Sequence, residues 1–121
     1  MMGQALASTG LTPYVLRLSP GEDLKVCLQQ VTQTHAIAAG CVVTAVGSLQ
    51  QVSLRFAGAS EPTVLIGKFE IVSLVGTLSI EGLHLHLAIA DAQGQMLGGH
   101  LMPGCLIYTT AETMPDKSPS T

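Results

Sequence analysis

Three histidines fall within a short stretch of the chain: His84 and His86 lie in the segment L-H-L-H-L, and His100 lies in G-G-H-L. Successive side chains of a β-strand point to opposite faces, so His84 and His86 share a face and the leucines between them point the other way. Their Cα atoms are then roughly 6.5–7 Å apart, close enough for both imidazoles to reach one ion. This pair is a candidate half of a metal site.

A predicted turn places the third histidine. The segment Asp91-Ala92-Gln93-Gly94 is typical of a type I turn followed by a glycine in the left-handed region. This three-residue hairpin loop pairs Asp91 with Gln95, and the same register puts His86 directly opposite His100. A bulge at Gly98-Gly99 would shift the register by one residue and send His100 to the other face.

Three neutral imidazoles with an open fourth position suit Zn²⁺ or a similar divalent ion. Such a site is either structural or catalytic, the latter through a bound water whose pKa the metal lowers. The pattern H-x-H also occurs on half-exposed strand faces that bind no metal. The histidine spacing alone leaves both interpretations open.

Arg55 is the only charged residue between Lys25 and Glu61, and it lies on the polar side of a predicted strand. Its guanidinium could bind a carboxylate or phosphate of a ligand. It could equally form a structural ion pair with Glu70 or Glu112. Of the two roles we favour the ion pair.

A single amphipathic helix is predicted over about residues 22–39. Its apolar face has helical spacing and consists of Leu24, Cys27, Leu28, Val31 and His35. Glu22 and Asp23 fall in the first turn, where the helix dipole favours acids, and Gly40 is placed to end the helix. On this face His35 is expected to be a core or interface residue rather than a metal ligand.

The residues after Gly40 have the patterns of β-strands. The candidate strands, with an earlier one at 14–18, are 41–46, 49–56, 68–80, 83–91, 96–101 and 105–110. Gly47-Ser48 is expected to break the chain between strands, and Gly76 to interrupt or bend one. The prediction is an α+β fold: one domain over 13–112 with the helix packed on a largely antiparallel sheet, a flexible lead-in at 1–12 and a disordered tail at 113–121.

Composition favours a self-associating protein that does not bind nucleic acid directly. Of 121 residues, 47% are apolar and only 11% are charged, which suggests that a partner covers part of the surface. The net charge is −3, and the five Lys and Arg residues are scattered rather than gathered in a basic stripe.

The cysteines Cys27, Cys41 and Cys105 are odd in number and far apart, so we expect buried, reduced thiols rather than disulfides or a thiolate zinc site. Residues 1–11 lack the pattern of a signal peptide, and the apolar runs are shorter than a membrane span. These features predict a cytoplasmic protein without membrane contact.

Four blocks in order resemble the plants and prokaryotes conserved (PPC) domain family, and the resemblance covers roughly residues 13–112. The blocks are G-S-L-Q-Q-V-S-L-R-F (47–56), F-E-I-V-S-L-V-G-T-L-S (69–79), H-L-H-L-A-I-A-D-A-Q-G-Q-M-L-G-G-H-L (84–101) and G-C-L-I-Y-T-T-A-E (104–112). The chain is similar to the stand-alone prokaryotic type, because no R-G-R-P segment of an AT-hook is present.

The resemblance implies a compact α+β domain that assembles into homotrimers. It also implies a metal site at the histidines matching His84, His86 and His100, and a place near the intersubunit region for Arg55 and Glu112. Plant members carry AT-hooks and act in nuclear DNA-associated regulators, and prokaryotic members are described as predicted DNA-binding proteins. This chain departs from the family after Glu112, where the final strand looks shortened.

Three functions stay open at this point. The first is a zinc-binding homotrimer of undefined activity that binds a small ligand or hydrolyses one. The second is a DNA-associated regulator or scaffold that acts through partners, and the third is a purely structural interaction module. Paired carboxylates, a phosphate loop and a dinucleotide fingerprint are all missing, so neither a reaction nor a substrate is indicated.

Overall fold

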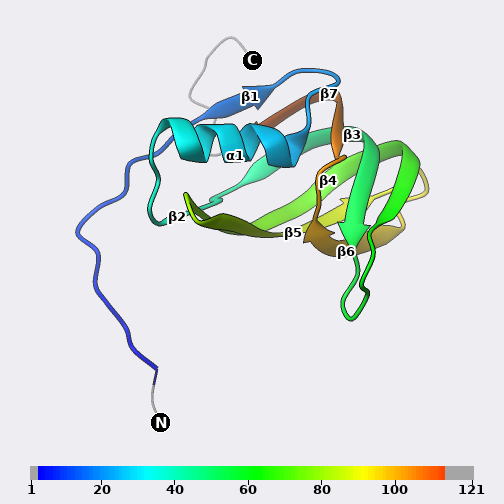
Figure 1. Cartoon of the computed structure of the whole chain (residues 1–121). Coiled ribbons are helices and arrows are strands. Elements are labelled where there is room, and N and C mark those ends of the chain that lie inside the picture. Colours follow the sequence, from blue (N-terminus) through cyan, green and yellow to red (C-terminus); the bar gives the residue numbers. More distant parts are fainter. Residues whose placement is uncertain (1–2, 114–121) are drawn as a thin grey trace.

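The computed structural model describes residues 3–113, which form one helix and seven strands (Figure 1). In chain order these are β1 (Leu16–Leu18), α1 (Leu24–Thr34), β2 (Gly40–Cys41), β3 (Ala45–Arg55), β4 (Thr63–Ser79), β5 (Gly82–Ala90), β6 (Met96–Leu101) and β7 (Leu106–Thr113). All strand pairings are antiparallel. The predicted α+β class, with one helix and a largely antiparallel sheet, is confirmed.

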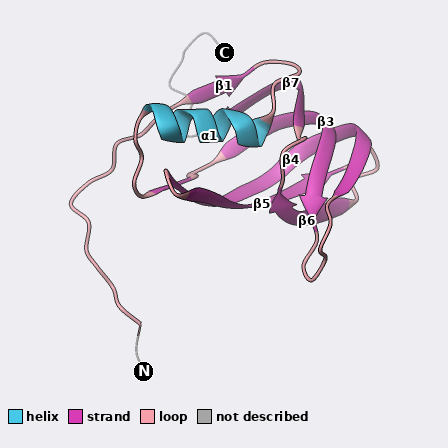
Figure 2. Ribbon diagram, viewed as in Figure 1, coloured by secondary structure: helices cyan, strands magenta, loops and turns pink. Residues whose placement is uncertain are grey.

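The sheet curls back on itself. Its strand order is β1-β7-β3-β6-β5-β4-β2, and β4 pairs with β3 as well as with β5, which closes β3, β6, β5 and β4 into a ring. In Figure 2 the helix lies along one side of this curled sheet, next to β1 and β7. The core is built mainly of aliphatic side chains, among them Leu24, Leu28, Leu49, Leu54, Leu85, Leu87, Ile89, Leu101 and Ile107. One face of each strand therefore packs into the core, and the outer face carries both polar side chains and exposed apolar ones such as Ile66.

The helix begins at Leu24 rather than near residue 22, because Asp23 is its N-cap. One carboxylate oxygen of Asp23 accepts a hydrogen bond from the Val26 N–H at 3.1 Å, and the other accepts one from the Gly104 N–H at 2.7 Å. A capping side chain in this position satisfies a backbone donor that the first turn would otherwise leave unpaired. The same residue therefore ties the helix to the loop between β6 and β7.

The helix ends at Thr34, so the predicted end at Gly40 is wrong. Ala36 takes the left-handed conformation with a φ of 50°, and its N–H donates to the carbonyl of Gln33. The Ile37 N–H donates to the carbonyl of Thr32 at 3.0 Å. These two bonds form a Schellman motif in which alanine occupies the position usually held by glycine, and this is why the glycine signal pointed to the wrong residue.

Two glycines expected to interrupt strands lie within them. A side chain at Gly47 would collide with the backbone of β7 at Thr110 and Ala111, so glycine here permits close approach, and the β3–β7 register shifts beside it. Gly76 has a φ of 147°, and a side chain there would collide with the carbonyl of His84. The expected break at Gly47-Ser48 is therefore wrong, whereas β4 runs through Gly76 opposite Leu85.

The three cysteines are free thiols in three different environments. Cys105 is buried and hydrogen-bonded to the backbone of Ser53, and burial raises the pKa of its thiol to about 11. Cys27 is half-buried, and partial burial followed by the charge of Glu22 raises its pKa. Cys41 is exposed, so the expectation that all three thiols are buried is wrong for this residue.

The chain ends differ only slightly from the expected boundaries. Residues 3–15 have no regular secondary structure and are mostly exposed, which fits the predicted lead-in at 1–12, although its flexibility stays a prediction. Thr113 belongs to β7, one residue beyond the expected start of the tail, and 114–121 lie outside the described residues. Within the described chain no helix has the length and apolar character needed to cross a membrane.

We expect Asp23→Ala to lower the free energy of unfolding by about 2 kcal/mol, because it removes the N-cap and leaves the Gly104 N–H without its acceptor. Urea denaturation of the full chain measures this change. The matched control is Glu61→Ala, which removes an exposed loop carboxylate and should change stability little. Equal stability of the two variants would contradict the structural role of Asp23.

Candidate metal site

The hairpin that carries the three histidines has the turn predicted from the sequence. The Asp91 N–H donates to the Gln95 carbonyl at 2.8 Å, and the Gly94 N–H donates to the Asp91 carbonyl at 2.9 Å. Gly94 has a φ of 82°, in the left-handed region. The Asp91 carboxylate also accepts the N–H groups of Gln93 and Gln95 at 2.9 and 2.8 Å, which fixes the turn further.

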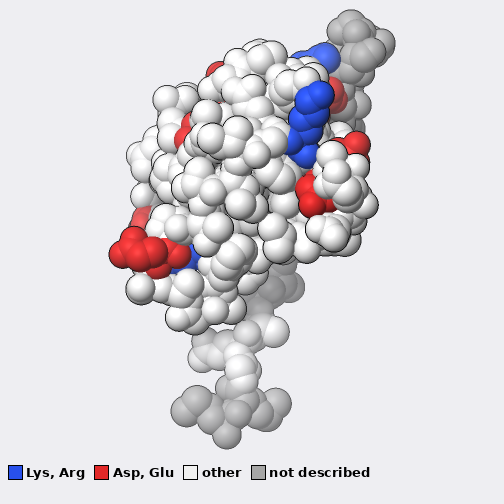
Figure 3. Space-filling model, turned by 90° about the vertical axis from the view of Figure 1, so that its right-hand side faces the viewer, with Lys and Arg blue, Asp and Glu red and all other residues white. Residues whose placement is uncertain are grey.

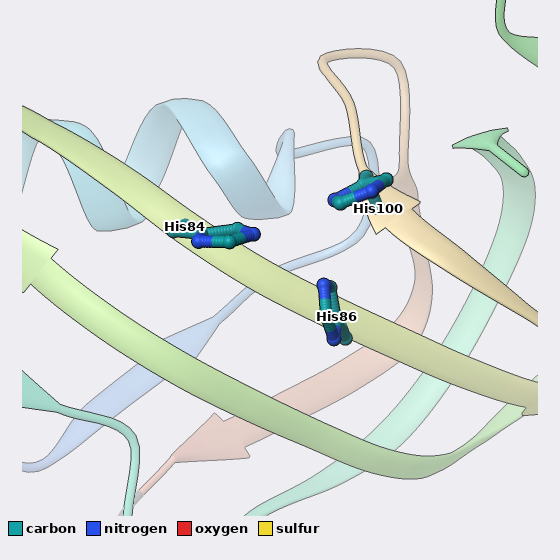
Figure 4. A group of neighbouring side chains, drawn as sticks. All are labelled: His84, His86 and His100. Atoms are coloured by element: carbon teal, nitrogen blue, oxygen red, sulfur yellow. The ribbon is translucent and has the colours of Figure 1, made fainter. Parts of the chain in front are cut away.

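The register of the β5–β6 pair brings the histidines together. His86 is paired with His100, and the ladder runs on without a shift through Gly99 and Gly98 to Met96. The bulge that would have separated the histidines is therefore not formed. His84 and His86 on β5 and His100 on β6 lie on the same face of the sheet, as Figure 4 shows.

The three imidazoles are close enough to share one ion. Their ring centroids are 5.1 Å apart for His84–His86, 4.7 Å for His86–His100 and 5.5 Å for His84–His100. One ring nitrogen of each lies within 4.8 Å of the other two. Tetrahedral zinc with Zn–N bonds of about 2.0–2.1 Å needs nitrogens roughly 3.4 Å apart. Small rotations of these side chains, of which two are exposed and one is half-buried, provide that approach.

The electrostatics favour the imidazole form that can bind a metal. Partial burial lowers the pKa of His100 below 6.5, and the positive charges of Arg55, His86 and His84 lower it further. A neutral imidazole has the free lone pair that a metal needs. Among the described residues no hydrogen bond to any of the three rings is formed, so their nitrogens are available. The donor set therefore fits a divalent ion of the zinc type.

Arg55 lies next to this cluster and forms no ion pair with Glu70 or Glu112, so the favoured interpretation of its role is wrong. It pairs with His100 across the β3–β6 contact, and its guanidinium donates to the Ala59 carbonyl at 3.2 Å. Glu112 instead lies 3.8 Å from the Arg17 guanidinium. The described part of the chain contains no other ion pair. The structure thus separates Arg55 from Glu112 and brings it to the histidines.

A shallow cavity of about 280 Å³ lies beside the histidines. Besides His86 and His100 it is lined by small or apolar residues: Ala57, Ser73, Leu87, Ala88, Gly98 and Gly99. Sequence reasoning missed these lining residues, although the Gly98-Gly99 pair was a signal for them. The sequence predicts no more from this pair than a possible bulge, whereas in the structure both glycines line the space beside the imidazoles.

The fourth histidine takes no part in the site. His35 is the residue that caps the C-terminal end of α1, and it is exposed. Its ring lies against Tyr14 with a centroid distance of 4.6 Å. Of the two expected places for His35, the core is wrong because the side chain is exposed, and a place at an interface stays a prediction.

Comparison with known proteins gives a family match over most of the chain. The model of the Plants and Prokaryotes Conserved (PCC) domain matches residues 6–115. The chain is 52% identical over 109 residues to the bifunctional protein GlmU of Synechococcus sp. (strain JA-3-3Ab), covering 90% of the chain and 18% of that protein. It is 37% identical over 109 residues to AT-hook motif nuclear-localized protein 10 of Arabidopsis thaliana, covering 79% of the chain and 30% of that protein. The chain thus spans less than a third of the length of these relatives.

Two solved structures share the fold. A hypothetical protein from Salmonella cholerae-suis is 47% identical with a TM-score of 0.81, and the match covers 83% of this chain and 72% of that one. A metal-containing protein from Archaeoglobus fulgidus is 24% identical with a TM-score of 0.68, covering 84% of this chain and 77% of that one. The second likeness, at this identity, concerns the fold alone.

We expect His100 of the metal-free full chain to titrate below pH 6.5, the ordinary value for histidine, because burial and neighbouring positive charges disfavour its protonated form. NMR titration of the imidazole resonances measures the midpoint. Arg55→Gln should raise this midpoint but leave it below 6.5, because partial burial is the larger cause. A midpoint above 6.5 in the unmodified chain would contradict the electrostatic description.

Proposed function

The chain belongs to the Plants and Prokaryotes Conserved (PCC) domain family, and we propose that it binds a divalent metal ion, zinc, on His84, His86 and His100. The observation that carries this proposal is the convergence of three imidazoles from two paired strands, each with a nitrogen within 4.8 Å of the others. Exposed imidazoles without competing hydrogen bonds are suitable ligands. The metal-containing protein from Archaeoglobus fulgidus, which shares the fold, gives additional support.

Zinc is the ion that this donor set suits best among common divalent ions. Three neutral nitrogens favour zinc and related transition metals over magnesium or calcium, which prefer oxygen ligands. Three protein ligands leave one position of a tetrahedral ion open, as in catalytic rather than structural zinc sites. When bound, zinc would supply Lewis acidity at this position. The protein's own part is to hold the three imidazoles on one face of the β5–β6 hairpin.

We further propose that the protein is a homotrimer. Several large apolar side chains are exposed on the curled sheet, among them Val64, Ile66, Val72, Val75, Met96 and Leu97. Ile66 alone has 81% of its surface exposed. Apolar surface of this kind usually marks an interface, and closed symmetric assembly is the usual way to cover it. The cytoplasm, where thiols stay reduced, suits the three free cysteines.

We expect the full chain, purified without an affinity tag and dialysed, to contain about one zinc per chain by elemental analysis. His86→Ala removes the central ligand and should weaken zinc binding at least about 100-fold, because two imidazoles cannot replace three. His35→Ala is the matched control, since this exposed histidine lies outside the cluster, and it should keep the metal.

The same sample serves to measure the solution mass, which should be three times the 12.5 kDa of one chain. The metal proposal is overturned if the unmodified chain takes up no zinc after incubation. It is also overturned if the His86→Ala variant binds as much zinc as the unmodified chain. A monomeric mass in the loaded sample would overturn the trimer and leave the metal proposal standing.

Association with DNA through partner proteins is the second candidate function, favoured by the similarity to a plant AT-hook protein. Direct contact is disfavoured by charge: the chain has five Lys and Arg against eight Asp and Glu. On the face in Figure 3 the basic side chains do not gather into a patch, and acidic ones lie beside them. We expect the purified chain not to be retained on immobilised duplex DNA at about 50 mM salt. Retention that falls as salt rises would contradict this expectation and indicate direct DNA binding.

A further inference from the structure

Arg55 has hydrogen-bonding capacity that the fold does not use. A guanidinium carries five N–H donors in a rigid fork. Among the residues described, the only hydrogen bond of the Arg55 side chain is the one to the Ala59 carbonyl. That bond ties the guanidinium to the loop between β3 and β4. Arg55 does not line the cavity itself, but it is paired with His100, which does. A half-buried guanidinium without a counterion calls for an anionic partner.

The surroundings of Arg55 contain no acidic side chain that pairs with it. Its cross-strand neighbour is His100, and among the described residues it forms no ion pair. The residues that line the cavity include no Asp or Glu. Ser73 contributes a hydroxyl, and Ala88, Gly98 and Gly99 contribute little more than backbone. The cavity therefore lies beside one fixed positive charge, that of Arg55, and its lining has no carboxylate to neutralise it.

The size of the cavity limits what could enter it. Its volume of about 280 Å³ is just below the usual range for ligand pockets, which is roughly 300–1,000 Å³, so only a small molecule would fit. A side chain at Gly99 would come within 2.9 Å of the Arg55 carbonyl, and one at Gly98 would reach the Leu87 carbonyl at 3.2 Å. Glycine at both positions keeps β6 close to its neighbours and the space beside His100 open.

We propose that the surface between Arg55 and His100, at the edge of this cavity, binds the carboxylate or phosphate group of a small molecule, with the Arg55 guanidinium as its main hydrogen-bond donor. The inference rests on the proposed metal site, because a divalent ion held by neutral imidazoles adds positive charge on the same side of the sheet. Arg55 acts here as a binding residue for the anion, and its backbone pairing with His100 sets its distance from the cluster. The shared chemistry is that of a small oxyanion.

The test measures the binding of inorganic phosphate and of acetate to the zinc-incubated full chain by isothermal titration calorimetry. Arg55→Gln should weaken the binding of the preferred anion by about tenfold or more, because a charge-assisted hydrogen bond is lost. Arg55→Lys keeps the charge but not the forked donor geometry, so its anion affinity should lie between that of the unmodified chain and that of Arg55→Gln. Tighter binding of one probe than of the other distinguishes a phosphate ligand from a carboxylate ligand.

Arg17→Gln is the matched control, because Arg17 is an exposed arginine paired with Glu112 on β7. It should leave anion affinity unchanged. Zinc content, solution mass and thermal midpoint are recorded for every variant, so that a folding defect is recognised. The inference is overturned if Arg55→Gln binds the anions with the same affinity as the unmodified chain. This holds also when the substitution changes the solution mass but leaves the anion affinity unchanged.

The outcomes separate this inference from the metal proposal. Zinc uptake without anion binding overturns the inference alone. If the chain takes up no zinc, the metal proposal fails, and anion binding that still depends on Arg55 supports the inference without it. If neither zinc nor anion binds, both are overturned.

Discussion

The arrangement of the site depends on the alternation of side chains along β5. Leu85, Leu87 and Ile89 point into the core and are at most 3% exposed. Burying such a side chain contributes about 1.5–3 kcal/mol, so a slip of one residue would cost several kcal/mol by exposing all three. The same alternation leaves His84 and His86 on the outer face. The core therefore fixes where the imidazoles lie, although none of them belongs to it.

The turn at Asp91 fixes the register between β5 and β6. Its carboxylate accepts two backbone N–H groups within the loop, and the left-handed Gly94 completes the three-residue connection. Because the loop length is fixed, the partner of His86 is fixed as well, and that partner is His100. The short β3–β6 contact then places Arg55 beside His100. A core, one turn and one short strand contact thus assemble four polar side chains that lie up to 45 positions apart in the chain.

Local rules allowed the sequence to predict the hairpin and its histidines, because the turn chemistry and the alternation both act within twenty residues. They failed where contacts distant in the sequence decide the structure. At the end of the helix they failed for a local reason instead: the helix ends at Thr34 because backbone hydrogen bonds of a Schellman motif stabilise a left-handed Ala36, which no residue preference indicates. Gly47 interrupts no strand, because its role is to let β7 approach closely. Arg55 could not be assigned a partner, since its neighbours come from a loop and from another strand.

Charge connects metal binding, anion binding and trimer assembly, the three properties proposed for the outer face of the sheet. Three neutral imidazoles leave the charge of a divalent ion uncompensated, and Arg55 adds a further positive charge on the same side. The cavity lining contributes no carboxylate that could offset it. A cluster of positive charge tolerates partial burial only with an anion beside it, because desolvation of unpaired charge is costly. Assembly that covers the exposed apolar side chains of the sheet would reduce the solvent around this face. Metal, anion and trimer are therefore expected to stabilise one another, with the anion making the charge of the metal compatible with assembly.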